Sequence, residues 1–187
     1  MPRLRLPDPP LTDGEITLRE WTLADVPALT RACQDPEIPR WTVVPSPYLE
    51  RHARDYIAGC AGDRNAGREL ALAIVDREDN LLGAIGIGRF DWEDRKAEIG
   101  YWIAREARQR AVGVRATRLL ACWALTELRL ERLELLANPG NEASQRLAER
   151  AGFTREGLLR RYRRRRGERE DLVMFGLLPQ DLPPGVP

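Results

Sequence analysis

Cysteine is scarce in this sequence and is not arranged for metal binding or cross-linking. The three cysteines, Cys33, Cys60 and Cys122, stand far apart, and no C-x-x-C pair occurs. A structural zinc site and a disulfide framework are therefore not expected. We interpret the three side chains as small, buried or half-buried hydrophobic residues.

Histidine is almost absent, which removes the residue most often used for acid–base catalysis. His52 is the one histidine, and no Ser-His-Asp or Cys-His arrangement can be read around it. We expect His52 at the surface or in a substrate groove rather than as a catalytic base. No metal site is predicted.

Long hydrophobic runs and an excess of one charge are also missing. No apolar run approaches the roughly 18 residues of a membrane span, and the first ten residues lack the apolar core of a signal peptide. The 30 basic and 29 acidic residues give a formal net charge of +1. This balance provides no general attraction to nucleic acid or anionic membrane. We expect a cytoplasmic protein without a membrane partner.

The length of 187 residues suits one domain with a sizeable core, and 43% hydrophobic residues is an ordinary fraction for a globular protein. Residues 14–178 are predicted to form this single domain. The proline-rich ends, residues 1–13 and 179–187, are predicted to be irregular tails.

Hydrophobic periodicity predicts an alternation of strands and helices. Strands are expected at 15–21, 69–76, 81–90, 96–104 and 132–137, with a closing hairpin of 153–164 and 170–178 around Gly167. Helices are expected at 22–35, 49–61, 112–128 and 142–151, with Gly152 ending the last one. Residues 35–48 contain four prolines and are expected to be a loop. This order indicates an α/β fold with a mixed sheet.

The helix predicted from about Val112 begins without the usual cap and is basic where the helix dipole is already positive. The arginines around this start are Arg105, Arg108, Arg110, Arg115 and Arg118. Free N–H groups at a helix start attract anions, and several in succession suit a diphosphate. The segment is neither a P-loop nor a dinucleotide fingerprint, since both glycine patterns are missing. A solvated arginine-rich loop is the alternative.

Three motifs in order resemble the GNAT superfamily of acetyl-CoA-dependent N-acetyltransferases, within it the RimJ/RimL-type branch. They are AEIGYWI (97–103), ARQRAVGVRATRLL (107–120) and NPGNEASQRLAERAGFTREG (138–157). DPEIPRWT (35–42) and EDLVMFGLL (170–178) also resemble that branch, so the resemblance spans roughly residues 14–178. It implies a GNAT-like mixed, mostly antiparallel sheet of six to seven strands with helices on both faces.

The family's pyrophosphate loop, Q/R-x-x-G-x-G/A, corresponds to Arg108, Ala111 and Gly113 here. The resemblance implies that the coenzyme diphosphate binds along Arg108, Gln109, Arg110, Ala111, Val112, Gly113 and Val114. Ala111 replaces the usual glycine and excludes backbone conformations that only glycine tolerates. A reshaped loop or weaker coenzyme binding follows as an expectation, and a non-catalytic coenzyme-A-binding module stays open as an alternative.

The resemblance also implies how the rest of acetyl-CoA is held. The strand 99–104 should splay from 132–137 and pair with the pantetheine amides. A backbone N–H near Trp102 or Ile103 should face the thioester oxygen. Asn138 or Asn141 should contact pantetheine.

Two residues are the expected catalytic groups. By resemblance, Glu98 deprotonates the amine through water, although a surface glutamate paired to an arginine is the alternative. Ser144 is the expected proton donor to the sulfur, where many superfamily members use a tyrosine. The local alternative is that Asn141 and Ser144 only form a helix cap.

The resemblance implies transfer of an acetyl group to a primary amine, by direct attack on the thioester. A protein N-terminus of ribosomal-protein type is the expected acceptor, and a small-molecule amine such as a polyamine or antibiotic is the alternative. Residues 35–60 and the last hairpin should form the acceptor groove, with Trp41 as a wall. The arginine-rich stretch 160–171 is interpreted as a solvated hairpin. The alternative is that it touches an acidic partner, such as ribosomal RNA near a ribosomal-protein substrate. A homodimer is a family expectation.

Overall fold

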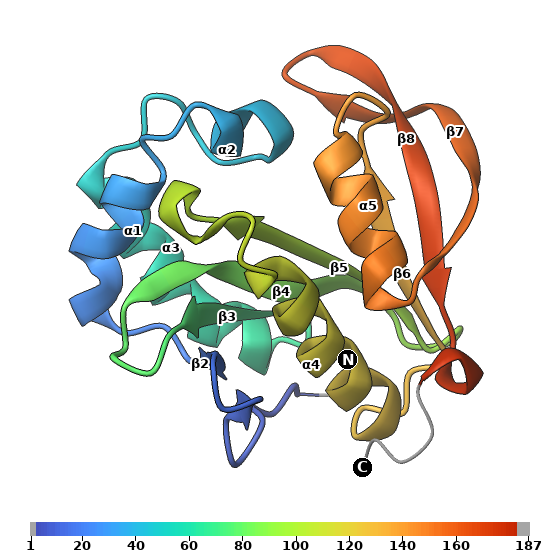
Figure 1. The fold of residues 1–187 in the computed structure, drawn as a ribbon, viewed down its shortest axis with the longest axis horizontal. Helices are drawn as coiled ribbons and strands as arrows, with labels where there is room; N and C mark the ends of the chain where they lie inside the picture. Colours follow the sequence, from blue (N-terminus) through green and yellow to red (C-terminus); the bar gives the residue numbers. More distant parts are fainter. Residues whose placement is uncertain (1–2, 183–187) are drawn as a thin grey trace.

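The computed structural model describes residues 3–182 and places an eight-stranded sheet at the centre of the molecule (Figure 1). The strand order is β1-β2-β3-β4-β5-β6-β8-β7. The strands are β1 (Leu11–Thr12), β2 (Thr17–Arg19), β3 (Glu69–Val75), β4 (Leu81–Asp91), β5 (Lys96–Ile103), β6 (Arg132–Ala137), β7 (Thr154–Arg165) and β8 (Glu168–Leu177). Only β5 and β6 run parallel, and every other pair is antiparallel. The mixed, mostly antiparallel α/β fold is therefore confirmed.

Helices cover both faces of the sheet, as expected. The helices are α1 (Val26–Ala32), α2 (Glu37–Trp41), α3 (Glu50–Asn65), α4 (Val112–Thr126) and α5 (Glu142–Ala151), with single 3-10 turns at Leu23–Asp25, Arg105–Ala107 and Pro179–Asp181. Alternation along β3 assigns the faces: Leu70 and Leu72 join the core under α4 and α5, whereas Ala71 and Ala73 join a second core under α1 and α3.

The segment predicted as an irregular N-terminal tail contributes a strand, which raises the count to eight. Leu11 and Thr12 pair with Leu18 and Thr17 of β2. Asp13 closes this hairpin, because its Oδ1 accepts the N–H groups of Glu15 and Ile16 at 3.0 Å. Such a side-chain turn is local chemistry that hydrophobic periodicity does not register. The last five residues of the predicted C-terminal tail lie outside the described residues.

The predicted loop 35–48 contains the short helix α2, so that expectation was wrong over Glu37–Trp41. Pro36 stands at the N-cap and Pro39 is the third helical residue. Prolines are tolerated there because the N–H groups of the first turn have no internal acceptor. The following helix α3 ends at Asn65, four residues beyond the predicted end.

The parallel pair β5–β6 opens into a gap in the sheet. Lys96 to Glu98 pair with Arg132 to Glu134, and beyond that point the two strands are no longer partners. β5 stays paired with β4 on its other edge as far as Ile103. The predicted splaying of this strand is confirmed, and it leaves one backbone edge of β5 available to a ligand.

Candidate functional site

A cleft of about 1040 Å³ follows this gap across the sheet. Its walls come from the α1–α2 region, the loop after β5, the start of α5 and the β7–β8 hairpin. Gly86, Gly88 and Gly100 lie on its floor. Apart from its own chain neighbours, no atom of the described residues lies within 4 Å of where a Cβ would stand on Gly100, so the missing side chain leaves open space for a ligand.

The loop before α4 forms an anion cradle from its backbone. None of the N–H groups from Gln109 to Val114 donates a hydrogen bond to another part of the described chain. Gln109 and Ala111 have φ angles of 62° and 58°, and left-handed residues of this kind turn successive N–H groups into one concavity. The first turn of α4 contains no acidic residue that would compete for them. A diphosphate fits this donor set.

Ala111 occupies the N-cap of α4 in the left-handed conformation that glycine adopts freely. Ala111 therefore holds a backbone conformation that glycine would adopt without strain. The cost of this conformation for alanine is about 1 kcal/mol. Gly113 has a different role, because a Cβ there would lie 2.4 Å from Leu147 Cδ1. Its absence lets α4 pack closely on α5.

The arginines around this loop are mostly engaged within the protein. Arg108 lines the cleft, but its Nη2 donates to Asp35 and its Nε donates to Ile103 O at 3.2 Å. Arg115 pairs with Asp13, and Arg118 donates to a backbone carbonyl of α5. Arg110 and Gln109 are exposed and line the cleft. The backbone, more than the arginine side chains, thus supplies the open donors.

The exposed edge of β5 presents alternate N–H groups to the gap. Ala104 N–H donates to Leu82 O at 2.8 Å, toward β4. Alternation along the strand then turns the N–H of Trp102 toward β4 and those of Tyr101 and Ile103 toward the gap. Of the two positions considered for contact with a thioester oxygen, the geometry favours Ile103 over Trp102.

Tyr101 is the residue that sequence reasoning missed. Its hydroxyl lies 2.9 Å from Ser144 Oγ, so the two form a hydrogen-bonded pair across the gap from β5 to α5. Burial raises the pKa of Tyr101 to about 12, which keeps the phenol protonated at neutral pH. The alternation along β5 could have identified Tyr101, because it lies on the same face of the strand as the buried residues Ala97 and Ile99.

The start of α5 is built by two asparagines that line the cleft. Asn141 is the N-cap, and its Oδ1 accepts the N–H of Ser144 at 3.1 Å. Asn138 Oδ1 accepts the N–H of Gly140 at 2.9 Å and so holds the turn between β6 and α5. Asn141 therefore has the capping role considered above, Asn138 stabilises a turn, and both residues also line the cleft.

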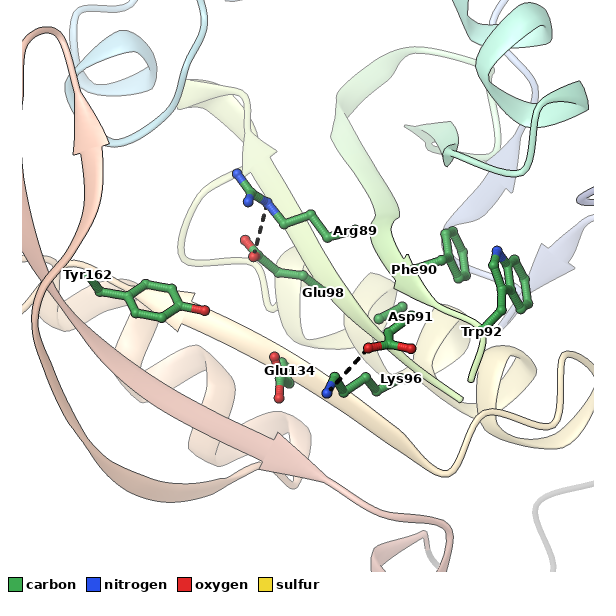
Figure 2. Close-up of a pocket in the computed structure, with 9 residues that line it drawn as sticks. Arg89, Phe90, Asp91, Trp92, Lys96, Glu98, Glu134 and Tyr162 are labelled. Carbon is green, nitrogen blue, oxygen red and sulfur yellow. Dashed lines mark ion pairs between the residues drawn. The ribbon is translucent and has the colours of Figure 1, made fainter. Parts of the chain in front are cut away.

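Glu98 is held between two arginines at the edge of the cleft, and Figure 2 shows the contact with one of them, Arg89. Arg163 Nη2 lies 2.9 and 2.6 Å from its two carboxylate oxygens, and Arg89 Nε lies 3.3 Å from Oε2. The side chain is 18% exposed. Glu98 also lines a second hollow of about 830 Å³ with Glu134 and Tyr162. The glutamate–arginine pairing is thus real, and it fixes the carboxylate at the cleft.

The segments predicted to form the acceptor groove line one side of the cleft, named the acceptor side after that prediction. Trp41 lines it, and its Nε1 donates to Glu37 Oε2 at 3.0 Å. Arg165 and Arg166 at the tip of the β7–β8 hairpin donate to backbone carbonyls of α2. Several arginines of this stretch therefore join the hairpin to α2 and the cleft.

His52 is not among the residues that line the cleft, although its ring contacts Tyr48, which is one of them. Its Nδ1 accepts the N–H of Leu49 at 3.1 Å and caps the start of α3. Within residues 3–182 no cluster of His, Cys, Asp and Glu is suited to hold a metal ion. No helix in that range has both the length and the apolar character that crossing a bilayer requires.

Comparisons with known proteins converge on one family. A family model described as an acetyltransferase (GNAT) domain matches residues 15–154. The "Uncharacterized N-acetyltransferase p20" of Bacillus licheniformis is 31% identical over 168 residues, which cover 89% of this chain and 94% of that protein. The "Putative ribosomal N-acetyltransferase YdaF" of Bacillus subtilis is 39% identical over 104 residues, which cover 56% of this chain and 57% of that protein.

A solved structure agrees in fold. RimJ of Mycobacterium smegmatis, in complex with CoA-disulfide, superposes with a TM-score of 0.82 and 24% identity, over 93% of this chain and 88% of that chain. These matches confirm the resemblance expected from the sequence motifs.

Proposed function

This chain belongs to the GNAT acetyltransferase family, and from that premise we propose that it transfers the acetyl group of acetyl-CoA to the amino terminus of a protein of ribosomal type. The observation that carries the proposal is the β5–β6 gap, with unpaired amides at one end and the Tyr101–Ser144 pair at its side. Together they provide a diphosphate cradle, a pantetheine edge and a hydrogen-bond donor for the leaving sulfur along one cleft.

Acetyl-CoA fits this cleft by its chemistry. The amides from Gln109 to Val114 bind the diphosphate, and the free edge of β5 pairs with the pantetheine amides. The bound coenzyme supplies a thioester whose carbonyl carbon is open to attack by an amine. The N–H of Ile103 faces the gap and stabilises the oxygen on which negative charge develops. The CoA-disulfide bound by the mycobacterial relative supports this assignment.

Glu98 accepts the proton that the attacking ammonium must lose. Its carboxylate borders the acceptor side of the cleft, and Arg163 and Arg89 fix its position. An amino terminus has a pKa near 8, so a modest base acting through one water is sufficient.

The Tyr101–Ser144 pair stabilises the thiolate that leaves when the thioester is cleaved. Complete transfer of the Tyr101 proton to a thiolate, whose thiol has a pKa of about 8.5 by analogy with cysteine, would be uphill. The pair therefore donates a hydrogen bond that disperses the charge of the thiolate, and water supplies the proton that completes the thiol. Ser144 bridges the phenol to the open end of the gap.

Two alternatives remain distinct from this proposal. A small-molecule amine would also enter a cleft of this volume. A non-catalytic coenzyme-A-binding module was suggested by Ala111, but the glycine-like backbone there and the Tyr101–Ser144 pair favour an enzyme.

An acceptor screen tests the proposal. Purified protein is incubated with acetyl-CoA and with N-terminal peptides of ribosomal proteins, polyamines or aminoglycosides, and free thiol is measured. Turnover on free N-termini, lost when the peptide N-terminus is blocked, is the expected result. Turnover confined to small amines selects the first alternative, and coenzyme binding without any turnover selects the second.

A further inference from the structure

Two carboxylates stand on the same face of the sheet, separated by a glycine. Glu69 of β3 pairs in register with Gly88 of β4, and Gly88 pairs with Glu98 of β5. Residues directly opposite one another share a face, so both glutamates point into the acceptor side of the cleft, which both line. Two strand spacings place their Cα atoms about 10 Å apart. Gly88 leaves the space between them free of a side chain.

Glu69 differs from the other glutamates of the cleft in having no partner. Glu98 pairs with Arg163, and Glu170 pairs with Arg165. Glu37 pairs with Arg40. Across the described part of the chain, Glu69 makes neither an ion pair nor a hydrogen bond through its side chain. The acceptor side therefore has one negative charge that the protein itself does not neutralise.

The surroundings of Glu69 do not favour this charge. Partial burial of the Glu69 carboxyl, with a smaller contribution from Asp63, raises its pKa, although the residue as a whole is exposed to solvent. Its neighbours on α3 include Tyr56, Cys60 and Asp63, none of which is cationic. Arg68 is occupied by Asp63 on the adjacent turn. Glu69 is exposed to solvent at the cleft and has no partner among the described residues, so its carboxylate is available to a cationic ligand.

We propose that Glu69 binds a second positive charge on the acceptor and thereby selects peptides with a basic side chain next to the reacting amino terminus. This inference rests on the proposed function, because it places the reacting amine at Glu98. The separation of about 10 Å between the two Cα atoms is comparable to the distance between the amino group and the side-chain ammonium of such a peptide when it is extended, which reaches about 10 Å. Glu69 acts in recognition and does not touch the thioester.

Matched peptides test this assignment. Two peptides beginning Ser-Lys and Ser-norleucine differ only in the ammonium group of the second side chain. We expect wild-type kcat/KM to favour the lysine peptide by about tenfold, the usual size of one charge-assisted contact. In Glu69→Gln the ratio should fall to about one, with turnover of the norleucine peptide unchanged. Glu69→Asp should retain part of the preference.

Asp55→Asn is the control, since it removes an exposed carboxylate of α3 that is not part of the cleft lining, and it should keep the preference. The inference is overturned if wild type shows no preference, if Glu69→Gln keeps it, or if both peptides lose activity equally in Glu69→Gln. A simple diamine that outperforms both peptides would also overturn it.

If wild type turns over neither peptide, the proposed function has failed rather than this inference. Calorimetric binding of the same peptides to the coenzyme-A-loaded protein then decides on Glu69. Tighter binding of the lysine peptide that depends on Glu69 supports its role in recognition, and equal binding contradicts it.

Discussion

At the scale of single residues, Ala111 holds a left-handed backbone at φ 58° that glycine adopts without strain. Ala111→Gly should therefore raise the free energy of unfolding by about 1 kcal/mol and the melting temperature by about 2–4 °C. Acetyl-CoA affinity should be preserved or improved. Ala58→Gly, at an exposed position within α3, is the control and should lower stability by about 1 kcal/mol. A lower melting temperature for Ala111→Gly would show that the loop has another geometry.

Glu98→Gln should lower turnover by about 10²–10³, the range for one positioned base. Affinity for acetyl-CoA should change little, because the carboxylate faces the amine. The defect should shrink as pH rises from 6 to 10, since more acceptor arrives already deprotonated. Measurement of kcat and kcat/KM across this range checks the prediction. Glu134→Gln is the matched control: Glu134 is the in-register neighbour of Glu98 on β6 and lines only the second hollow (Figure 2). Equal losses in both variants would remove Glu98 from the mechanism.

The raised pKa of Glu69 determines the direction in which this residue changes stability with pH. Its pKa in the folded protein is raised above the ordinary value of 4.5, so folding favours the protonated form. The ionised carboxylate lowers stability at pH 7, and this penalty vanishes below about pH 4.5, where both states are protonated. Glu69→Gln should raise the melting temperature slightly at pH 7 and leave it unchanged near pH 4. Thermal melts at the two pH values check this. A stabilisation that persists near pH 4 would assign the effect to something other than charge.

At the scale of elements, the site depends on one strand and one helix start that face each other across the gap. Tyr101 and Ser144 act through a shared hydrogen bond, so their effects should not add. Ser144→Ala should lower kcat about tenfold, Tyr101→Phe at least as much, and the double variant little more than Tyr101→Phe alone. Steady-state kinetics of the three variants, with acetyl-CoA binding measured separately, give the comparison. Fully additive losses would show that the two hydroxyls act independently.

Most elements could be predicted from hydrophobic periodicity, because both cores impose it on the strands and long helices. The alternation of Leu70 and Ala71 in β3, for example, encodes both faces of the sheet. The helix α2 could not be predicted this way, since a five-residue helix with two prolines at its start has no periodic face. The two-residue strand β1 depends on the turn that Asp13 forms, and hydrophobic periodicity could not predict it either.

The candidate site was only partly predictable. The family motifs located Glu98, Ser144 and the loop 108–114, and the structure brings them to one cleft. Contacts between distant segments were not predictable: Arg108 with Asp35, Glu98 with Arg163, and Tyr101 with Ser144. Each of these joins residues that are far apart in sequence, and a single sequence carries no pairing information for them.

At the scale of the whole molecule, ligand binding should stabilise the fold. We expect acetyl-CoA to contact β5, α4 and α5, three elements that line the cleft. Acetyl-CoA at a concentration of about 100 times its dissociation constant should add roughly 2.7 kcal/mol to the free energy of unfolding. The melting temperature should rise by about 5–10 °C. Unchanged melting temperature and calorimetric heats at saturating acetyl-CoA would contradict coenzyme binding.

The measurement that tests the central claim most directly is amide-resolved NMR during titration with acetyl-CoA. The claim is that the unpaired N–H groups from Gln109 to Val114 hold the diphosphate, while the edge of β5 holds pantetheine. We predict that acetyl-CoA causes the largest chemical-shift changes at these amides and at those of Tyr101 and Ile103. Pantetheine, which lacks the diphosphate, should change only the shifts of Tyr101 and Ile103. Binding that leaves the amides of 109–114 unchanged would contradict the account.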